Sequence, residues 1–498
     1  METITVSNRY KFHLDQKFII FSFVICAIVI ISTYWMRNYA NDDAYITYRH
    51  TQNLLRGNGF VFNPNEKVLG STAPFHGIIL AVISLVYPDI PKSALLLSAF
   101  SLIFICILIM DLLRKFQLLL PGFLFSILIV TNKFTYSVFP LETIFLLFLC
   151  IITVYFLHKE NYTAMAIFGG IAVLTRADAI VLISVIYLYL VFVKKLTLKE
   201  LLPTFALFLL ILLPWFIYSR MFYGSFFPNT ANTKTGWINH EWVFIKSIWS
   251  KGLRQIFPNQ WLSMIAVGIS LIGIVVSVKI KHLRFFLILG IWIILYTTAY
   301  TILRIYGPFF WYYFPIFVVV VFFFSIGYWY IYNVISEKVR NNFIKNFMHL
   351  SMALAIFVLI SFNLIDLYNY PSTFYKNFFI LGRDTAYKMG AKWLQEHPNT
   401  CKNIAIYEPG TLAFYSNRHM IDMMGLITPG IGQEMKMRSL HEVSVLWTAE
   451  HYQPECIFVL SHIQVPKNYV LIQNFPMEEV GTSFHLYIEE DLYDFSGK

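Results

Sequence analysis

The chain has 498 residues, of which 57% are hydrophobic, 18% aromatic and only 13% charged, and its mean hydropathy is +0.61. A soluble globular protein carries about 25% charged and about 45–50% apolar residues. The composition therefore excludes a soluble enzyme, a disordered protein and a small disulfide-rich secreted domain. It predicts a polytopic α-helical membrane protein.

The net charge of +10 is distributed unevenly along the chain. Residues 369–498 contain 10 basic and 14 acidic residues, whereas residues 1–368 contain 28 basic and 14 acidic ones. The basic residues lie between apolar runs, which is the pattern of cytoplasmic loops in membrane proteins and not of a surface that follows nucleic-acid phosphates. We expect membrane lipids as partners and no nucleic acid.

Apolar runs long enough to cross a bilayer, or nearly so, predict about eleven transmembrane helices. These runs cover residues 18–36, 92–113, 116–131, 140–157, 162–175, 178–193, 201–219, 261–280, 284–303, 309–333 and 346–368. A twelfth run, 73–87, is short and begins with Pro74 and His76. If it crossed, every later basic cluster would face outward, so we predict that it lies along the outer membrane surface. The N-terminus is then cytoplasmic and the C-terminus lies outside.

The tail has a different character from the rest of the chain. Short β-type runs at 404–408, 419–424, 456–460, 469–472 and 484–490 alternate with helical patterns at 384–395 and 432–449, and residues 409–410 predict a turn. We therefore predict two domains. Residues 1–368 form the transmembrane domain with an outer-face loop at 37–91, and residues 369–498 form a small extracytoplasmic α/β domain.

Two of the five cysteines lie at or near the start of predicted strands in this tail, Cys401 and Cys456. They could meet at one edge of the sheet, and an exported domain permits a disulfide. Two free thiols are the alternative.

The polar side chains of the membrane part gather at the predicted outer ends of the spans. The segment from Asn41 to Thr72 reads NDDAYITYRHTQNLLRGNGFVFNPNEKVLGST and begins with two adjacent carboxylates, Asp42 and Asp43. This segment is either an ordinary solvated loop or a catalytic one, in which one Asp removes a hydroxyl proton and the other orients it or the acceptor.

This segment resembles the signature of GT-C glycosyltransferases, which are multi-span enzymes that use lipid-phosphate-linked sugars on the outer membrane face. The similarity is to the bacterial arabinofuranosyltransferase branch and to polyprenyl-phosphate-sugar-dependent mannosyltransferase-like proteins. The matching positions are Asp42, Asp43, Ala44, Tyr45, Ile46, Arg49, Gly57, Gly59, Phe62, Asn63, Pro64, Glu66, Gly70, Thr72 and Pro74.

Four later pieces resemble the same family in the same order. They are PLET at 140–143, LTRADA at 174–179, YGSFFPNTANTK at 223–234 and GTLAFYSNRHMIDMMGL at 410–426. The chain departs from the family pattern at Pro140, Ala177 and Ala179.

The resemblance implies a bacterial cytoplasmic-membrane enzyme that moves a sugar from a polyprenyl-phosphate donor to a hydroxyl of a glycan, lipid or protein acceptor. We expect Asp42 as the base, with Asp43 either orienting it or contacting a divalent metal ion. The expected donor-phosphate contacts are Arg176, Arg304 and Lys234. The expected substrate contacts are Tyr45, Arg49, His50, Glu142, Asp178 and Asn229.

Other classes of function remain open at this point. A transporter or lipid flippase would keep carboxylates at the middle of its spans, and a non-catalytic scaffold for envelope assembly would not need the carboxylate pair. Among enzymes, a protein O-glycosyltransferase or an oligosaccharide ligase is the alternative.

Overall fold

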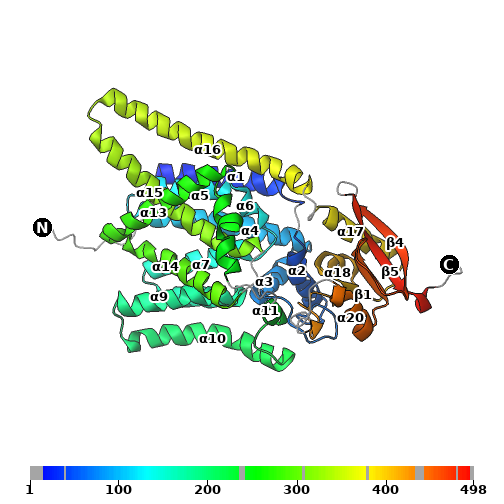
Figure 1. Cartoon of the computed structure of the whole chain (residues 1–498). Helices are drawn as coiled ribbons and strands as arrows, with labels where there is room; N and C mark the ends of the chain where they lie inside the picture. Colours follow the sequence, from blue (N-terminus) through cyan, green and yellow to red (C-terminus); the bar gives the residue numbers. More distant parts are fainter. Residues whose placement is uncertain are drawn as a thin grey trace.

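The structure is a computed structural model of the chain. It describes residues 15–38, 41–234, 242–304, 309–376, 381–431, 434, 442–477 and 481–493. The chain forms a helical bundle with a small sheet at one end, and the first and last described segments lie at opposite ends of the molecule (Figure 1).

The bundle is built from long helices that lie roughly parallel to one another, joined by short ones at the end that faces the sheet (Figure 1). The helices are α1 (Gln16–Trp35), α2 (Asp42–Leu55), α3 (Pro74–Ser84), α4 (Ile90–Arg114), α5 (Leu119–Val130), α6 (Lys133–Ser137), α7 (Thr143–His158), α8 (Tyr162–Thr175), α9 (Ile180–Phe192), α10 (Leu198–Tyr223), α11 (Asn229–Lys234), α12 (Val243–Ser247), α13 (Gln260–Lys279), α14 (Leu287–Ile302), α15 (Phe314–Lys338) and α16 (Asn342–Lys376).

Each of the eleven predicted spans contains a helix. Within the described residues, seven helices are long and apolar enough to cross a membrane, and the shorter apolar helices include α5, α7, α8 and α9. Helix α3 has 11 residues. That corresponds to about 16 Å, about half of the bilayer's hydrocarbon thickness. Helix α5 is also short, with 12 residues, so length does not separate residues 73–87 from the predicted spans, and their place along the outer membrane surface stays a prediction.

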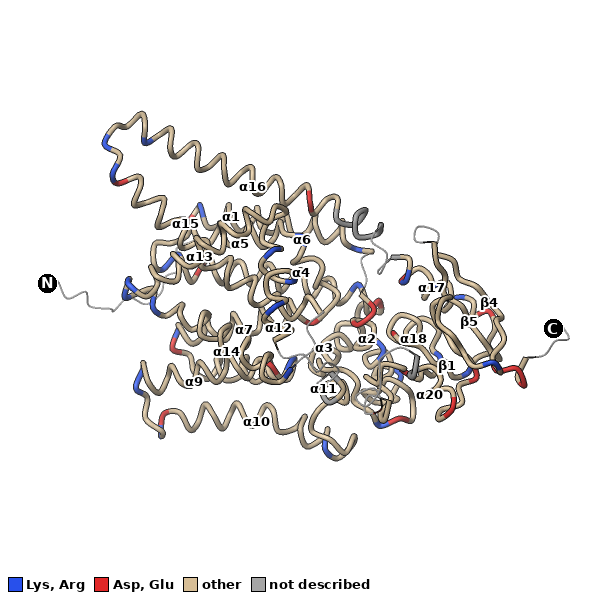
Figure 2. The backbone as a smooth tube through the Cα atoms, viewed as in Figure 1, with Lys and Arg blue, Asp and Glu red and all other residues tan. Residues whose placement is uncertain are grey.

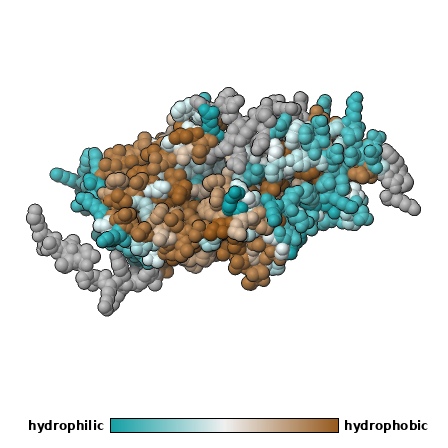
Figure 3. All heavy atoms as spheres, turned by 90° about the horizontal axis from the view of Figure 1, so that it is seen from below, coloured by the Kyte–Doolittle hydropathy of each residue, from teal (hydrophilic) through white to brown (hydrophobic). Residues whose placement is uncertain are grey.

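The surface of the bundle is apolar where lipid would contact it. On the face that Figure 3 draws, hydrophobic surface covers the helices and hydrophilic surface lies at both ends of the molecule. The membrane-crossing window of α15 is 72% buried inside the protein, whereas that of α16 is 11% buried. Helix α15 is therefore a central helix, and α16 is a peripheral one that the bilayer would surround.

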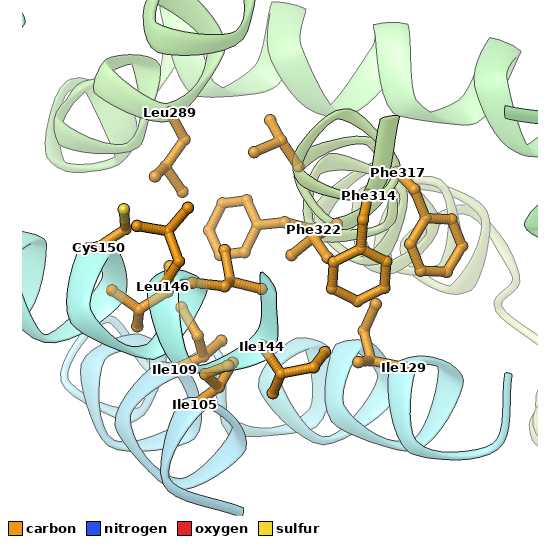
Figure 4. Packing of buried hydrophobic residues seen from close by; sticks show 14 of the residues in the cluster. Ile105, Ile109, Ile129, Ile144, Leu146, Cys150, Leu289, Phe314, Phe317 and Phe322 are labelled. Carbon is orange, nitrogen blue, oxygen red and sulfur yellow. The ribbon is translucent and has the colours of Figure 1, made fainter. Parts of the chain in front are cut away.

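The interior of the bundle is packed with aliphatic and aromatic side chains from α4, α5, α7, α14 and α15 (Figure 4). Helices α13 and α15 come into backbone contact at two glycines. A Cβ at Gly273 would lie 1.9 Å from the carbonyl oxygen of Phe323, and one at Gly327 would lie 2.1 Å from that of Ile269. Small residues permit this close approach, which is a common basis of helix association in membranes.

The C-terminal unit contains α17 (Leu381–Glu396), α18 (Gly410–Ser416) and α20 (Glu442–Tyr452) with strands β1 (Asn403–Ile406), β2 (His419–Asp422), β3 (Cys456–Leu460), β4 (Tyr469–Met477) and β5 (Thr482–Glu489). The strand order is β2-β1-β3-β5-β4, with β1 parallel to β2 and β3, and β5 antiparallel to β3 and β4. All five predicted strands are present. Helix α17 confirms the prediction at 384–395, and part of 432–449 lies outside the described residues.

The structure decides between the two alternatives for the cysteines of this unit and corrects the predicted turn. Cys401 and Cys456 form a disulfide that joins the starts of β1 and β3, so the free-thiol alternative is wrong. The turn predicted at residues 409–410 is instead the start of α18. The side chain that caps this helix belongs to Asp42, which is 368 residues away in sequence, so the local sequence carries no capping signal.

Candidate active site at the junction of the bundle and the C-terminal unit

The two adjacent carboxylates lie at the N-terminus of α2, where the bundle meets the C-terminal unit. The side chain of Asn41 caps α2 by accepting a hydrogen bond from the backbone N–H of Asp43. The carboxylate of Asp42 accepts backbone hydrogen bonds from Gly410 (3.1 Å to Oδ2) and Thr411 (2.7 Å to Oδ1). Asp42 therefore begins one helix and caps another, and both of its oxygens are held in place.

Burial and neighbouring charge make Asp42 a weak acid. Its side chain is 6% exposed. Burial, followed by the nearby Glu408 carboxylate, raises the pKa of Asp42 to about 7, against the opposing effects of Arg383 and the Thr411 hydrogen bonds. A carboxyl group with a pKa near neutrality is suited to accept a proton under physiological conditions.

Asp43 has a different environment, although it is the next residue. Its side chain is only partly buried, and within the described residues its carboxylate accepts no hydrogen bond. Asp43 is therefore less enclosed than Asp42, whose two oxygens both accept backbone N–H groups.

Two residues of the C-terminal unit that the sequence did not single out border these carboxylates. Arg383 of α17 donates from Nη1 to Oε1 of Glu408 (2.6 Å), and the hydroxyl of Tyr387 donates to Oε2 (3.2 Å). Burial acts to lower the pKa of Arg383, but Glu408, Asp42 and Asp43 are among the groups that raise it above its usual value. No local motif surrounds Arg383 or Glu408, so only the folded chain identifies them.

The three predicted substrate contacts on α2 are Tyr45, Arg49 and His50, and each binds a neighbouring segment of the protein. The hydroxyls of Tyr45 and Tyr415 lie 3.2 Å apart. Arg49 donates to the carbonyl oxygen of Phe62 (3.2 Å) and also bonds the side chains of Gln52 and Asn417. With Tyr45 3% and Arg49 0% exposed, these side chains reach neighbouring elements rather than open solvent.

His50 is fully buried and both of its ring nitrogens have partners. Nδ1 lies 2.8 Å from the carbonyl oxygen of Ile46, and Nε2 accepts from the backbone N–H of Gly70 (3.3 Å). Burial lowers the pKa of His50 to about 4, so the ring is neutral at physiological pH. This geometry favours a structural role for His50.

The loop motif FNPNE binds the edge of the sheet. The side-chain amide of Asn63 donates to the carbonyl oxygen of Met420 (2.9 Å) and its oxygen accepts from the Met420 N–H (3.1 Å), as a neighbouring strand would. Glu66 pairs with His419 at 2.6 Å. The motif therefore protects β2, an edge strand that would otherwise be open to pairing.

The predicted substrate contact Asn229 also joins the two units. Its side chain donates to the carbonyl oxygens of Gly425 (2.9 Å) and Leu426 (3.0 Å). Lys234 ends the same short helix, and its side chain lies outside the described part of the structure. Arg304 is an exposed residue just after α14, in the left-handed backbone conformation.

Glu142, Arg176 and Asp178 form a second cluster, inside the bundle. Arg176 donates to Glu142 (2.7 Å from Nη1), to Asp178 (2.8 Å from Nη2) and to the hydroxyl of Tyr300 (3.1 Å). Its guanidinium carbon lies 5.1 Å from the ring centroid of Tyr312. Two carboxylates already neutralise this arginine, so a phosphate approaching it would meet a net negative cluster.

The described residues do not fit the divalent metal ion considered for Asp42 and Asp43. Within them, no group of three or more His, Cys, Asp or Glu side chains could hold a metal ion. Each oxygen of Asp42 already accepts one backbone N–H, so the protein orients this carboxylate without a cation. We derive no catalytic step through a metal.

An apolar recess of about 470 Å³ lies between α2, α3, α8 and α10. Residues that line it include Leu54, Phe60, Phe75, Leu174, Pro214 and Trp215. It meets the C-terminal end of α2, whereas the carboxylates are at the N-terminal end, about 20 Å away along a 14-residue helix. The recess is suited to an apolar chain and does not itself contain the carboxylates.

Solved structures with the same architecture exist. The chain is similar to ArnT from Cupriavidus metallidurans in the apo state, with a TM-score of 0.61 and 14% identity. The match covers 96% of this chain and 98% of ArnT. It also matches ArnT bound to undecaprenyl phosphate, with a TM-score of 0.57 and 14% identity over 94% of this chain and 97% of that one. These are GT-C glycosyltransferases. This chain has the GT-C fold.

A third GT-C structure and a family match complete the comparison. The Archaeoglobus fulgidus oligosaccharyltransferase in complex with Zn and sulfate matches with a TM-score of 0.56 and 13% identity, over 89% of this chain and 67% of that one. Residues 376–491 match a domain of unknown function, DUF8728. No curated protein matches the chain in sequence. The GT-C fold and the multi-pass architecture are therefore established, and the arabinofuranosyltransferase branch remains an expectation.

Proposed function

We propose that this GT-C protein transfers a sugar from a polyprenyl-phosphate donor to a hydroxyl of a cell-envelope acceptor at the outer face of a bacterial cytoplasmic membrane. The observation that carries the proposal is the oriented, near-neutral carboxyl of Asp42 beside the accessible Asp43, in a fold shared with a protein bound to undecaprenyl phosphate. Because the fold is also similar to that of an oligosaccharyltransferase, an oligosaccharide is the alternative to a single sugar as the transferred group.

In the proposed reaction, Asp42 removes the proton of the acceptor hydroxyl as its oxygen attacks the anomeric carbon. The bond between that carbon and the phosphate oxygen breaks, and the lipid phosphate leaves with the bonding electrons. Asp43 accepts a hydrogen bond from the acceptor and orients it. The apolar recess would hold a segment of the isoprenoid chain.

The leaving phosphate needs positive charge nearby. Arg304 and Lys234 remain our candidates for this contact. Arg176 does not serve as this contact in the proposed reaction, because its guanidinium pairs with Glu142 and Asp178. We propose that Glu142 and Asp178 stabilise the bundle through Arg176. We propose that the remaining predicted substrate contacts hold α2 and the neighbouring loops in place; these are Tyr45, Arg49, His50 and Asn229.

A transfer assay tests this function. The purified protein, in vesicles, would receive a panel of radiolabelled polyprenyl-phosphate pentoses and hexoses together with envelope glycans, lipids and proteins. Label should reach an acceptor, and excess undecaprenyl phosphate should compete. Movement of the donor across the bilayer without transfer would instead support a flippase, and a preparation that binds donor without transferring or moving it would support a scaffold.

The rate of transfer should fall as the pH drops through about 7. The base must be unprotonated, and the pKa of Asp42 is raised to about 7, so the unprotonated fraction decreases below that pH. We expect kcat at pH 6 to be about tenfold below its value on the plateau above pH 8. An acidic limb near pH 4, typical of an exposed carboxylate, would contradict the assignment of Asp42 as the base.

We also propose that the C-terminal unit is extracytoplasmic and the N-terminus cytoplasmic. The distribution of basic residues supports this orientation. The disulfide between Cys401 and Cys456 supports it too, because disulfides persist in oxidising compartments.

In intact cells, a membrane-impermeant reductant followed by an impermeant maleimide should label the protein. Replacement of both Cys401 and Cys456 by Ser should abolish the labelling, because Cys26, Cys106 and Cys150 lie in the transmembrane helices. If labelling required cell lysis, the orientation would be the reverse.

A further inference from the structure

The C-terminal unit touches the candidate base directly. A Cβ at Gly410 would lie 2.1 Å from the carbonyl oxygen of Asp42 and 2.9 Å from its Oδ2, so only glycine allows α18 to approach this closely. The amides of Gly410 and Thr411 are the donors that orient the Asp42 carboxylate. The position of Asp42 therefore depends on where α18 sits.

The position of α18 is in turn linked to α17 by an ion pair. Glu408 lies two residues before α18, and Arg383 of α17 binds its Oε1 at 2.6 Å while Tyr387, one turn further along α17, binds its Oε2. Figure 2 shows the acidic start of α2 beside α17 and α18. The Arg383 guanidinium thus stands among three carboxylates, those of Glu408, Asp42 and Asp43.

We infer that the C-terminal unit is a working part of the catalytic centre, in which Arg383 and Glu408 are positioning residues that act through Asp42. The inference rests on the proposed transfer reaction. The C-terminal unit then does more than bind the acceptor independently or stabilise the loops of the bundle.

The physical reason is that three carboxylates in one junction repel one another. The positive charge of Arg383 offsets part of this repulsion, and its bond to Glu408 fixes the strand-to-helix turn that carries the two amide donors. Without Arg383, Glu408 loses its charged partner and α18 loses a constraint, so the Asp42 carboxylate is free to turn away from the acceptor.

The test compares Arg383→Gln, Arg383→Lys and the matched control Lys392→Gln, which removes the same charge from an exposed position on the same helix. We expect kcat per folded molecule to fall about 100-fold in Arg383→Gln, because a misplaced catalytic group costs about that much. The KM values for donor and acceptor should stay within about twofold, Arg383→Lys should recover part of the loss, and Lys392→Gln should match wild type.

A second pair of variants probes the contact at α18. Gly410→Ala should reduce kcat at least as strongly as Arg383→Gln, whereas Gly268→Ala, a helical glycine with open space around it, should have no effect. Hydrogen exchange in residues 42–48 should be faster in Gly410→Ala and Arg383→Gln than in the two controls.

Three outcomes overturn the inference. They are wild-type kcat in Arg383→Gln, a loss explained entirely by the unfolded fraction, and a rise in acceptor or donor KM with kcat unchanged, which would make Arg383 a binding residue. If the wild-type protein transfers no sugar at all, the proposed function fails. Unchanged hydrogen exchange would then reject the positioning role separately.

Discussion

Replacement of Asp42 by Asn should lower kcat for sugar transfer about 1,000-fold, because the acceptor hydroxyl loses the base that takes its proton. The substitution keeps the size of the side chain and removes its charge. It also places an amide group next to the N–H donors of Gly410 and Thr411, where one of the two hydrogen bonds is lost. Activity must therefore be expressed per folded molecule.

The control for this experiment is Asp89→Asn. Asp89 caps α4 by accepting from the N–H of Lys92, so the substitution removes the same charge from a helix cap outside the site. It should leave transfer unchanged. Asp43→Asn should cost about 10- to 100-fold through loss of acceptor orientation. If Asp43→Asn abolished transfer while Asp42→Asn kept it, the two residues would exchange roles, with Asp43 as the base.

Replacement of Arg176 by Met should destabilise the protein by about 3–5 kcal/mol, because it leaves the carboxylates of Glu142 and Asp178 unpaired inside the bundle. Unfolding in mixed micelles would measure the change. Neutralising the whole cluster, as Arg176→Met with Glu142→Gln and Asp178→Asn, should recover most of the stability. This result would assign the cluster to folding.

Lys194→Met provides the comparison, since the pair between Lys194 and Glu160 is more exposed and is expected to contribute at most about 1 kcal/mol. A different result would restore Arg176 as a donor contact. In that case Arg176→Met would remain nearly as stable as wild type while KM for the lipid-linked donor rose steeply.

Much of the architecture follows from the sequence because it depends on local patterns. Runs of apolar residues predict the spans, since a helix in lipid must satisfy its own backbone and expose apolar side chains. The alternating runs of the tail predict the five strands. The distribution of basic residues also predicts that residues 73–87 lie along the outer membrane surface.

The carboxylate pair was also visible in the sequence, but its surroundings were not. Residues 42–74, 223–234 and 410–426 each resemble a family pattern separately, and hydrogen bonds join them at one junction in the folded chain. Their shared location explains why these segments have their particular side chains. Arg383 and Glu408 belong to the same junction without belonging to any recognisable motif.

The sequence by itself determined a polytopic helical membrane protein with an α/β tail and a conspicuous pair of acids. Only the tertiary structure decided which groups the buried polar side chains bind. It placed Asp42 on the amides of Gly410 and Thr411, enclosed Arg176 between two carboxylates, and gave both nitrogens of His50 backbone partners. Hydrophobic periodicity reports which side chains are removed from solvent. The partner of a buried charge depends on which distant segments pack against it, and that is fixed only when the whole chain has folded.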